Sequence, residues 1–211
     1  YKIFHCSTVV SDEETPLTAI KNSKDSSMWN SINSQTIFNS NITLSAGNTG
    51  VLFVVSRMLL KTIDSVSKPA LAGLWPNKKN MNVVLDLGAN VECDENNLVD
   101  FSEMGAALYK ALFPQDSPKV ALLNIGSEQI KGTETLKKAY AKLKDLSKYG
   151  DFQFDGFIEG NKITSGESNV IITDGFTGNV ALKTAEGTAK FVTDSLKDSL
   201  TSTFAAKFSI L

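Results

Sequence analysis

The sequence predicts an α/β fold with a mainly parallel sheet, and two observations indicate this class. Short apolar runs, each passing into a polar turn that contains glycine, are typical of buried strands; they cover residues 41–44, 82–85, 119–123 and 169–173. Helical patterns of apolar residues follow these turns at residues 51–62, 98–112, 134–146 and 180–200. This repeated order is that of a parallel sheet with crossover helices, which binds ligands at the carboxyl ends of its strands. We therefore expect all four turns to lie along one sheet edge.

The individual elements rest on local patterns. Within residues 134–146, Leu136, Tyr140 and Leu143 recur close to every fourth position, which places them on one helix face. The apolar pair before Glu159 and Gly160 predicts another strand end in the same layer. We expect residues 1–211 to form a single α/β domain. Because both ends of the chain are apolar, we also expect it to be part of a longer protein.

Composition excludes several classes of protein. With 42% hydrophobic residues, 21% charged residues and a net charge of -2, the chain is globular and has no basic bias towards nucleic acid. Cys6 and Cys93 lie far apart, and His5 is the single histidine, so a zinc site and a disulfide are both disfavoured. We expect a reduced, cytoplasmic protein without a metal or cofactor. The longest apolar run, which ends at Leu60, is too short to span a bilayer.

The four turns are candidate anion sites. Glycine lets the backbone approach a ligand closely, and a helix that begins just after the turn offers unpaired N–H groups. Asparagines accompany the glycines: Asn48, Asn90, Asn124 and Asn179. Such turns also occur merely as connections, and the residues alone leave both interpretations open.

Three charged residues near these turns could take part in chemistry. Lys131 precedes the third helix and could balance a phosphate or a developing oxyanion, although a solvated surface lysine is the alternative. Asp86 and Asp174 each close a strand and could act as bases, but helix capping is the favoured interpretation. No GxSxG, GxGxxG or GxxxxGK[ST] motif is present, so any reaction has to use a nucleophile from its substrate.

The chain resembles the PlsX family, the bacterial phosphate acyltransferases of phospholipid synthesis. The matching strings occur in family order: KDSSM, SAGNTG, KPALAGLWP, VVLDLGANVECD, LLNIGSEQIKGTE, FIEGNKITSG and DGFTGNVALKTAEG. The resemblance implies a Rossmann-like α/β/α sandwich related to phosphotransacetylases and to isocitrate and isopropylmalate dehydrogenases, assembled as a homodimer. It also implies a reaction in which inorganic phosphate attacks acyl-acyl carrier protein and forms acyl phosphate.

The resemblance implies site residues as well. Lys131 takes the main catalytic or phosphate-binding role. The implied phosphate- or substrate-binding residues are Ser45, Gly47, Asn48, Thr49, Asp86, Gly88, Asn90, Asn124, Gly126, Asp174, Gly175, Gly178 and Asn179. SAGNTG is then one wall of a phosphate pocket to which Lys131 supplies the cation. Thr133 departs from the family, which usually has Asn at this position.

Alternative functions stay open beside this one. One is a phosphotransacetylase-like enzyme that takes acyl-coenzyme A as the acyl donor, and another is a noncatalytic scaffold that binds acyl carrier protein. At the C-terminal end, an apolar stripe recurs at every fourth residue: Val192, Leu196, Leu200, Phe204 and Phe208. Packing on the protein itself or across a dimer is favoured for this stripe. The resemblance implies a second interpretation of the same stripe, which is peripheral contact with a membrane.

Overall fold

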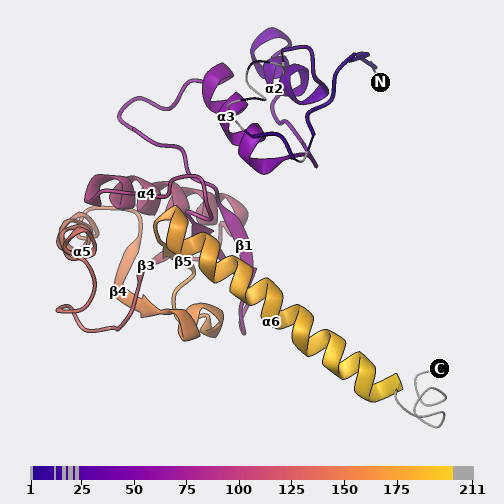
Figure 1. The fold of residues 1–211 in the computed structure, drawn as a ribbon. Helices are drawn as coiled ribbons and strands as arrows, with labels where there is room; N and C mark the ends of the chain where they lie inside the picture. The colour runs from indigo at the N-terminus through magenta and orange to yellow at the C-terminus, as the bar shows by residue number, and fades with distance from the viewer. Residues whose placement is uncertain (1, 12, 16–17, 19–20, 22–23, 202–211) are drawn as a thin grey trace. The chain divides into compact units, whose positions relative to one another are not determined.

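The computed structural model describes residues 2–11, 13–15, 18, 21 and 24–201. The chain divides into two compact units, Tyr1–Leu71 and Ala72–Leu211 (Figure 1). Each unit has its own core, so each is described by itself. The expectation of a single domain stays a prediction.

Two helices of the first unit, α2 and α3, lie wholly within the described residues and have a small core between them. Helix α2 (Ser27–Ile37) begins after Ser26, whose hydroxyl accepts the Trp29 N–H, and α3 (Thr49–Leu59) begins after Asn48. The core side chains are Met28, Ile32, Val51 and Val55. The α3 helix confirms the helical pattern predicted at residues 51–62.

The second unit is built on a five-stranded sheet in the order β1-β2-β5-β3-β4. The strands are β1 (Gly73–Pro76), β2 (Met81–Leu85), β3 (Lys119–Asn124), β4 (Gln153–Glu159) and β5 (Val170–Ile172). Strand β1 pairs antiparallel with β2, and the other pairings are parallel. The central strand β5 is fully buried, as its unbroken Val-Ile-Ile sequence requires.

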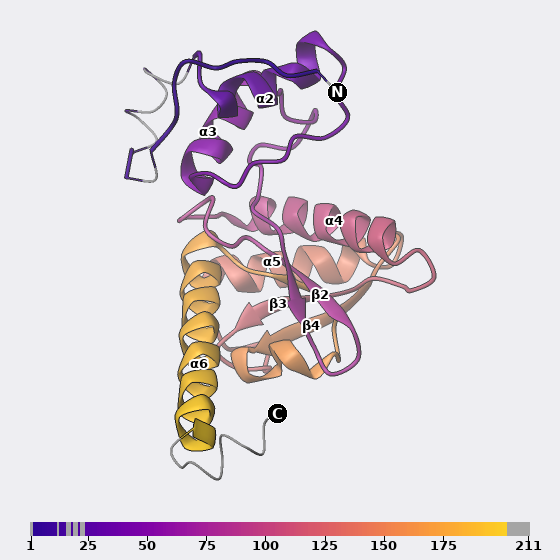
Figure 2. The ribbon, with the colours of Figure 1, turned by 90° about the vertical axis from the view of Figure 1, so that its right-hand side faces the viewer.

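Up to residue 201, three helices and a short 3₁₀ segment accompany the sheet: α4 (Glu95–Leu112), α5 (Glu134–Leu146), η1 (Gly160–Ser165) and α6 (Gly175–Thr201). Helix α4 packs on β2, β5 and β3, α5 packs on β3 and β4, and the two helices contact each other. The start of α6 contacts β2, whereas the rest of it extends away from the sheet as a long rod (Figures 1 and 2).

The sequence predicted most of this unit. Strands β2, β3, β4 and β5 are confirmed, as are the helices α4, α5 and α6, and the fold is a mostly parallel, Rossmann-like α/β arrangement. Strand β1 was not predicted, because four residues that include Pro76 give too short a pattern.

The strand predicted at residues 41–44 is wrong. This segment has no regular structure, and its apolar side chains are exposed, Ile42 at 77% and Leu44 at 89%. A strand needs a neighbour to satisfy its backbone groups. Among the described residues of the first unit, the β pairing is a single bridge between Thr8 and Ser26. The SAGNTG turn therefore does not end a strand of the sheet.

Candidate functional site

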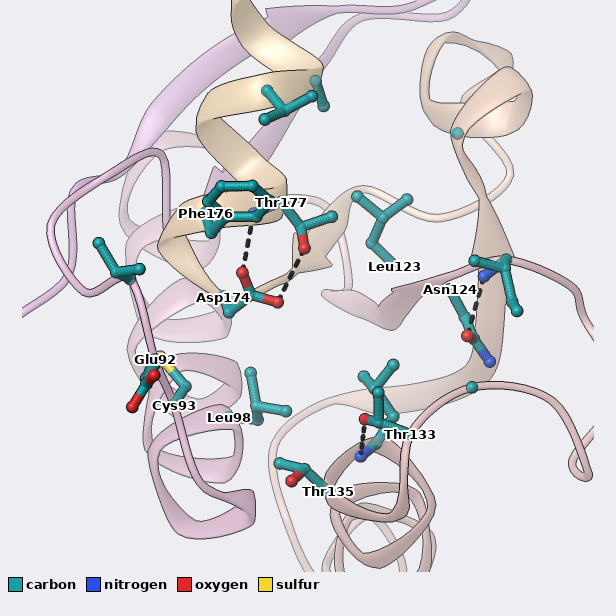
Figure 3. Close-up of a pocket in the computed structure, with 17 residues that line it drawn as sticks. Glu92, Cys93, Leu98, Leu123, Asn124, Thr133, Thr135, Asp174, Phe176 and Thr177 are labelled. Atoms are coloured by element: carbon teal, nitrogen blue, oxygen red, sulfur yellow. Dashed lines mark hydrogen bonds between the residues drawn. The ribbon is translucent and has the colours of Figure 1, made fainter.

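The turns that follow β2, β3 and β5 lie together at the carboxyl edge of the parallel sheet, as predicted for three of the four turns. Residues from these turns and from the adjoining helices line a cavity of about 950 Å³, which we call the edge pocket (Figure 3). Its lining residues are Val91, Glu92, Cys93, Leu98, Leu123, Asn124, Ile125, Gly132, Thr133, Thr135, Leu136, Gly160, Asp174, Phe176, Thr177, Val180 and Ala181. The sheet edge thus carries a pocket where the topology places ligands.

The turn after β2 is organised by a buried carboxylate. Asp86 is fully buried, and its oxygens accept hydrogen bonds from the N–H groups of Gly88, Ala89 and Asn90 at 3.1, 2.9 and 2.8 Å. The Asn90 side-chain amide donates a further bond at 2.7 Å. These backbone donors are therefore engaged by the protein's own anion. Asp86, Gly88 and Asn90 support the edge, and direct phosphate contact by them stays a prediction.

Helix α6 is fixed to this same turn. The Gly175 N–H donates to the Asn90 carbonyl at 2.8 Å, and the Asn179 side-chain amide donates to the Leu87 carbonyl at 3.3 Å. A Cβ atom at Gly178 would collide with the Asp86 carbonyl oxygen. The family-matched residues Gly175, Gly178 and Asn179 thus allow α6 to approach the end of β2 closely.

Asp174 caps the start of α6. Its carboxylate accepts the Thr177 N–H at 2.7 Å and the Thr177 hydroxyl at 2.9 Å, and it lies half-buried in the edge pocket (Figure 3). The capping interpretation is thereby confirmed for Asp174. It is wrong for Asp86, because α4 begins only at Glu95 and its cap is Asp94. A capping carboxylate also makes the adjacent wall of the pocket unfavourable for an anion.

The turn after β3 is braced by Asn124, and most of its backbone N–H groups have no partner among the described residues. Asn124 accepts the Ile125 N–H at 2.8 Å and donates to the Lys131 carbonyl at 3.2 Å, so it holds both ends of the turn. Gly132 has a φ of +88°, and a Cβ there would collide with the Asn124 amide. Within residues 126–132, the Lys131 N–H donates to Glu128; the other backbone N–H groups have no partner among the described residues.

Lys131 lies on this turn but does not line the edge pocket. Its side chain is exposed and forms no ion pair within the part of the chain that the structure describes. A Cβ added to the buried Gly126 would lie 3.1 Å from Lys131 Cγ and 2.6 Å from a Glu128 carboxylate oxygen. Glu128 is exposed, so it can rotate away from an incoming anion. This turn therefore combines unpaired N–H groups with a cation.

The SAGNTG residues have local roles in the first unit. Asn48 accepts the Val51 N–H at 3.1 Å as the cap of α3 and donates to the Glu14 carbonyl at 3.2 Å. The Gly47 N–H donates to the Ser45 hydroxyl at 3.3 Å, and Thr49 begins the helix. A shared site for Ser45, Gly47, Asn48 and Thr49 with Lys131 stays a prediction.

Sequence reasoning missed the apolar residues of the edge pocket. They flank the predicted turns closely: Val91, Leu98, Leu123, Ile125, Leu136, Phe176 and Val180. Their position next to polar turns was the available signal, but an apolar residue at a strand end is usually assigned to the core. Among the described residues, no group of His, Cys, Asp and Glu could hold a metal ion.

Comparison with solved structures defines the fold class. The chain is similar to the EutD phosphotransacetylase from Staphylococcus aureus, with a TM-score of 0.60, 16% identity, and coverage of 84% of this chain and 60% of that one. A phosphotransacetylase from Streptococcus pyogenes aligns with a TM-score of 0.61 at 16% identity, over 83% of this chain and 59% of that one. The fold is therefore of the phosphotransacetylase type.

Sequence comparison then shows the family. The model of the family described as "Fatty acid synthesis protein" matches residues 1–211, and the chain belongs to that family. The phosphate acyltransferase of Pelagibacter ubique is 54% identical over all of this chain and 63% of its own length. That of Erythrobacter litoralis is 45% identical over all of this chain and 59% of its length. The chain thus spans about three fifths of these curated relatives.

Proposed function

We propose that this chain is part of a phosphate acyltransferase that forms acyl phosphate and free acyl carrier protein from acyl-acyl carrier protein and inorganic phosphate. The observation that carries the proposal is the turn of residues 125–132, where unpaired N–H groups and Lys131 lie beside a largely apolar pocket. Such a turn suits an anion, and such a pocket suits an acyl group. Relatives named phosphate acyltransferase support the reaction.

The reaction needs no nucleophile from the protein. An oxygen of hydrogen phosphate attacks the thioester carbonyl carbon, the carbon–sulfur bond breaks, and the phosphate proton passes to the departing thiolate. The products are acyl phosphate and the carrier-protein thiol. The protein positions the two reactants and stabilises the negative charge that develops on the carbonyl oxygen. Lys131 and the N–H groups of its turn take these roles in our proposal.

The supporting residues hold the site in place. Asp86 and Asn90 fix the start of α6, and Asn124 fixes the turn that carries Lys131. This division assigns Lys131 to catalysis and these three residues to positioning. Ser45, Gly47, Asn48 and Thr49 stay in the proposal as further phosphate ligands on the strength of their family match.

Replacing Lys131 tests the proposal. We expect Lys131→Ala to lower kcat/KM for acyl phosphate formation by about 10²–10³-fold, as removal of an oxyanion-stabilising group does. Lys144→Ala, which removes an exposed lysine from α5, should leave activity within about twofold. Urea unfolding curves should coincide for both variants and the wild type. Unchanged turnover in Lys131→Ala would refute the assignment.

The choice of acyl donor separates this proposal from its alternatives. Acyl phosphate formed from acyl-coenzyme A but not from acyl carrier protein would favour a phosphotransacetylase-like enzyme. Binding of acyl carrier protein without turnover of either donor would favour a scaffold.

We also propose a cytoplasmic homodimer with peripheral membrane contact. Among the described residues, no helix is long and apolar enough to cross a bilayer. Val192, Leu196 and Leu200 are exposed on α6, whereas Phe204 and Phe208 lie outside the described residues. We expect the chain to sediment with anionic vesicles and Phe204→Asp plus Phe208→Asp to abolish this. Undiminished binding by the double variant would contradict membrane contact through this end.

A further inference from the structure

The turn of residues 125–132 is held at its ends, but its middle has few contacts. Asn124 braces both ends, and the Lys131 N–H donates to the Glu128 carbonyl at 3.0 Å inside the turn. Ile130 is 80% exposed, so apolar packing does not fix this part of the chain. A segment with so few contacts samples several conformations unless another element holds it.

One side chain ties the middle of the turn to helix α5. The Gln129 side-chain amide donates a hydrogen bond to the Tyr140 hydroxyl at 2.8 Å. Among the described residues, it is the one hydrogen bond that joins residues 126–130 to another element. Because Gln129 is two residues from Lys131 in the sequence, this bond acts close to the cation of the turn.

Tyr140 is itself firmly placed against strand β4. The centroid of its ring lies 4.9 Å from that of Phe157 and 5.2 Å from that of Phe154, and both phenylalanines belong to β4. Between them the register with β3 shifts, and Gly156 has a φ of +87°. A Cβ at Gly156 would lie 3.2 Å from the Tyr140 ring. The irregularity in β4 therefore makes room for the ring, which holds the hydroxyl at a fixed position.

A hydrogen bond to a fixed hydroxyl prepares the turn for an anion. Without this bond, phosphate binding has to order the turn, and the cost of ordering weakens binding. We propose that Gln129 and Tyr140 are positioning residues, which hold residues 125–132, and Lys131 with them, in the conformation that binds phosphate. This inference rests on the proposed function and adds two residues to it. Neither residue lines the edge pocket, so their role is separate from that of the pocket.

Two single variants and their combination test this role. Tyr140→Phe keeps the ring and removes the hydroxyl, whereas Gln129→Ala removes the donor. We expect each to raise KM for phosphate about three- to tenfold, the effect of losing one hydrogen bond, and to leave kcat and KM for hexadecanoyl-carrier protein within about twofold. The double variant should be no worse than either single variant, because both changes remove the same bond. Tyr149→Phe, which changes a tyrosine that is 88% exposed, is the control and should behave as the wild type.

The division between KM and kcat distinguishes positioning from a structural role. A general loss of stability lowers the fraction of folded protein and thereby kcat, so a fall in kcat with unchanged KM for phosphate would contradict the proposal. Phosphorus NMR titration with inorganic phosphate makes the same comparison without turnover. Weaker phosphate binding in both single variants supports the positioning role even if the wild type turns over no donor, a result that would refute only the proposed function. Effects that multiply in the double variant, phosphate binding that neither single variant weakens, or a wild type that binds no phosphate would overturn the inference.

Discussion

At the scale of single residues, the site depends on side chains that hold turns in place. Asp86 is the clearest case, because four donors converge on a carboxylate with no exposure to solvent. A buried carboxylate is tolerated when its oxygens are fully hydrogen-bonded. The residue therefore supports the fold of the sheet edge, and its direct contact with phosphate stays a prediction.

Asp86→Asn should destabilise the protein markedly. The amide replaces one acceptor oxygen with a donor, so at least one buried N–H loses its partner, at a cost of about 1–3 kcal/mol each. Urea unfolding at neutral pH measures the change. Asp151→Asn, at an exposed position, is the control and should stay within about 0.5 kcal/mol of the wild type. Equal stability of the two variants would show that the buried carboxylate does not support the turn.

At the scale of elements, the start of α6 is fixed by close backbone contact. Gly175 and Gly178 lie against the turn after β2, where neither position has room for a Cβ atom. Farther along the same helix, Gly187 has nothing within 4 Å of the position of its missing Cβ. Within this helix, Gly178 and Gly187 thus form a matched pair, because packing requires the first and leaves the second free.

Alanine at these two glycines should act in opposite directions. Gly178→Ala forces α6 away from the Asp86 carbonyl and should lower the free energy of unfolding by about 1–3 kcal/mol. Gly187→Ala should raise it by about 0.5–1 kcal/mol, because alanine favours the helix. Thermal unfolding of both variants provides the measurement. A stabilising Gly178→Ala would mean that α6 does not dock closely on β2.

The sequence indicated these elements to different degrees. Strands β2, β3 and β5 and helices α4 to α6 were predictable because each carries a continuous or periodic apolar pattern. Residues 41–44 have such a pattern too, but a strand also requires a neighbouring strand to pair with. A pattern of four residues does not indicate whether that neighbour exists. The site was predictable as a set of turns. The engagement of the amides by Asp86 was not, because it depends on how the turn folds back.

At the scale of the whole molecule, the second unit contains the pocket and the cation of the proposed chemistry, and the first unit carries the further phosphate ligands that we propose. Its sheet edge provides the braced turn of residues 125–132, the exposed Lys131 and the edge pocket. The chain spans about three fifths of the length of its curated relatives, so its activity has to be measured directly. The proposed mechanism still makes one definite prediction. The substrate supplies the nucleophile, whereas the protein positions the reactants and stabilises the developing charge.

The most direct test is whether hexadecanoyl-carrier protein is consumed only when inorganic phosphate is present. We predict that hexadecanoyl phosphate and free carrier-protein thiol appear in equal amounts, that both rates saturate with phosphate, and that Lys131→Ala loses this dependence together with activity. Consumption of the thioester without phosphate, with release of free fatty acid, would contradict the account, because water and not phosphate would then be the nucleophile.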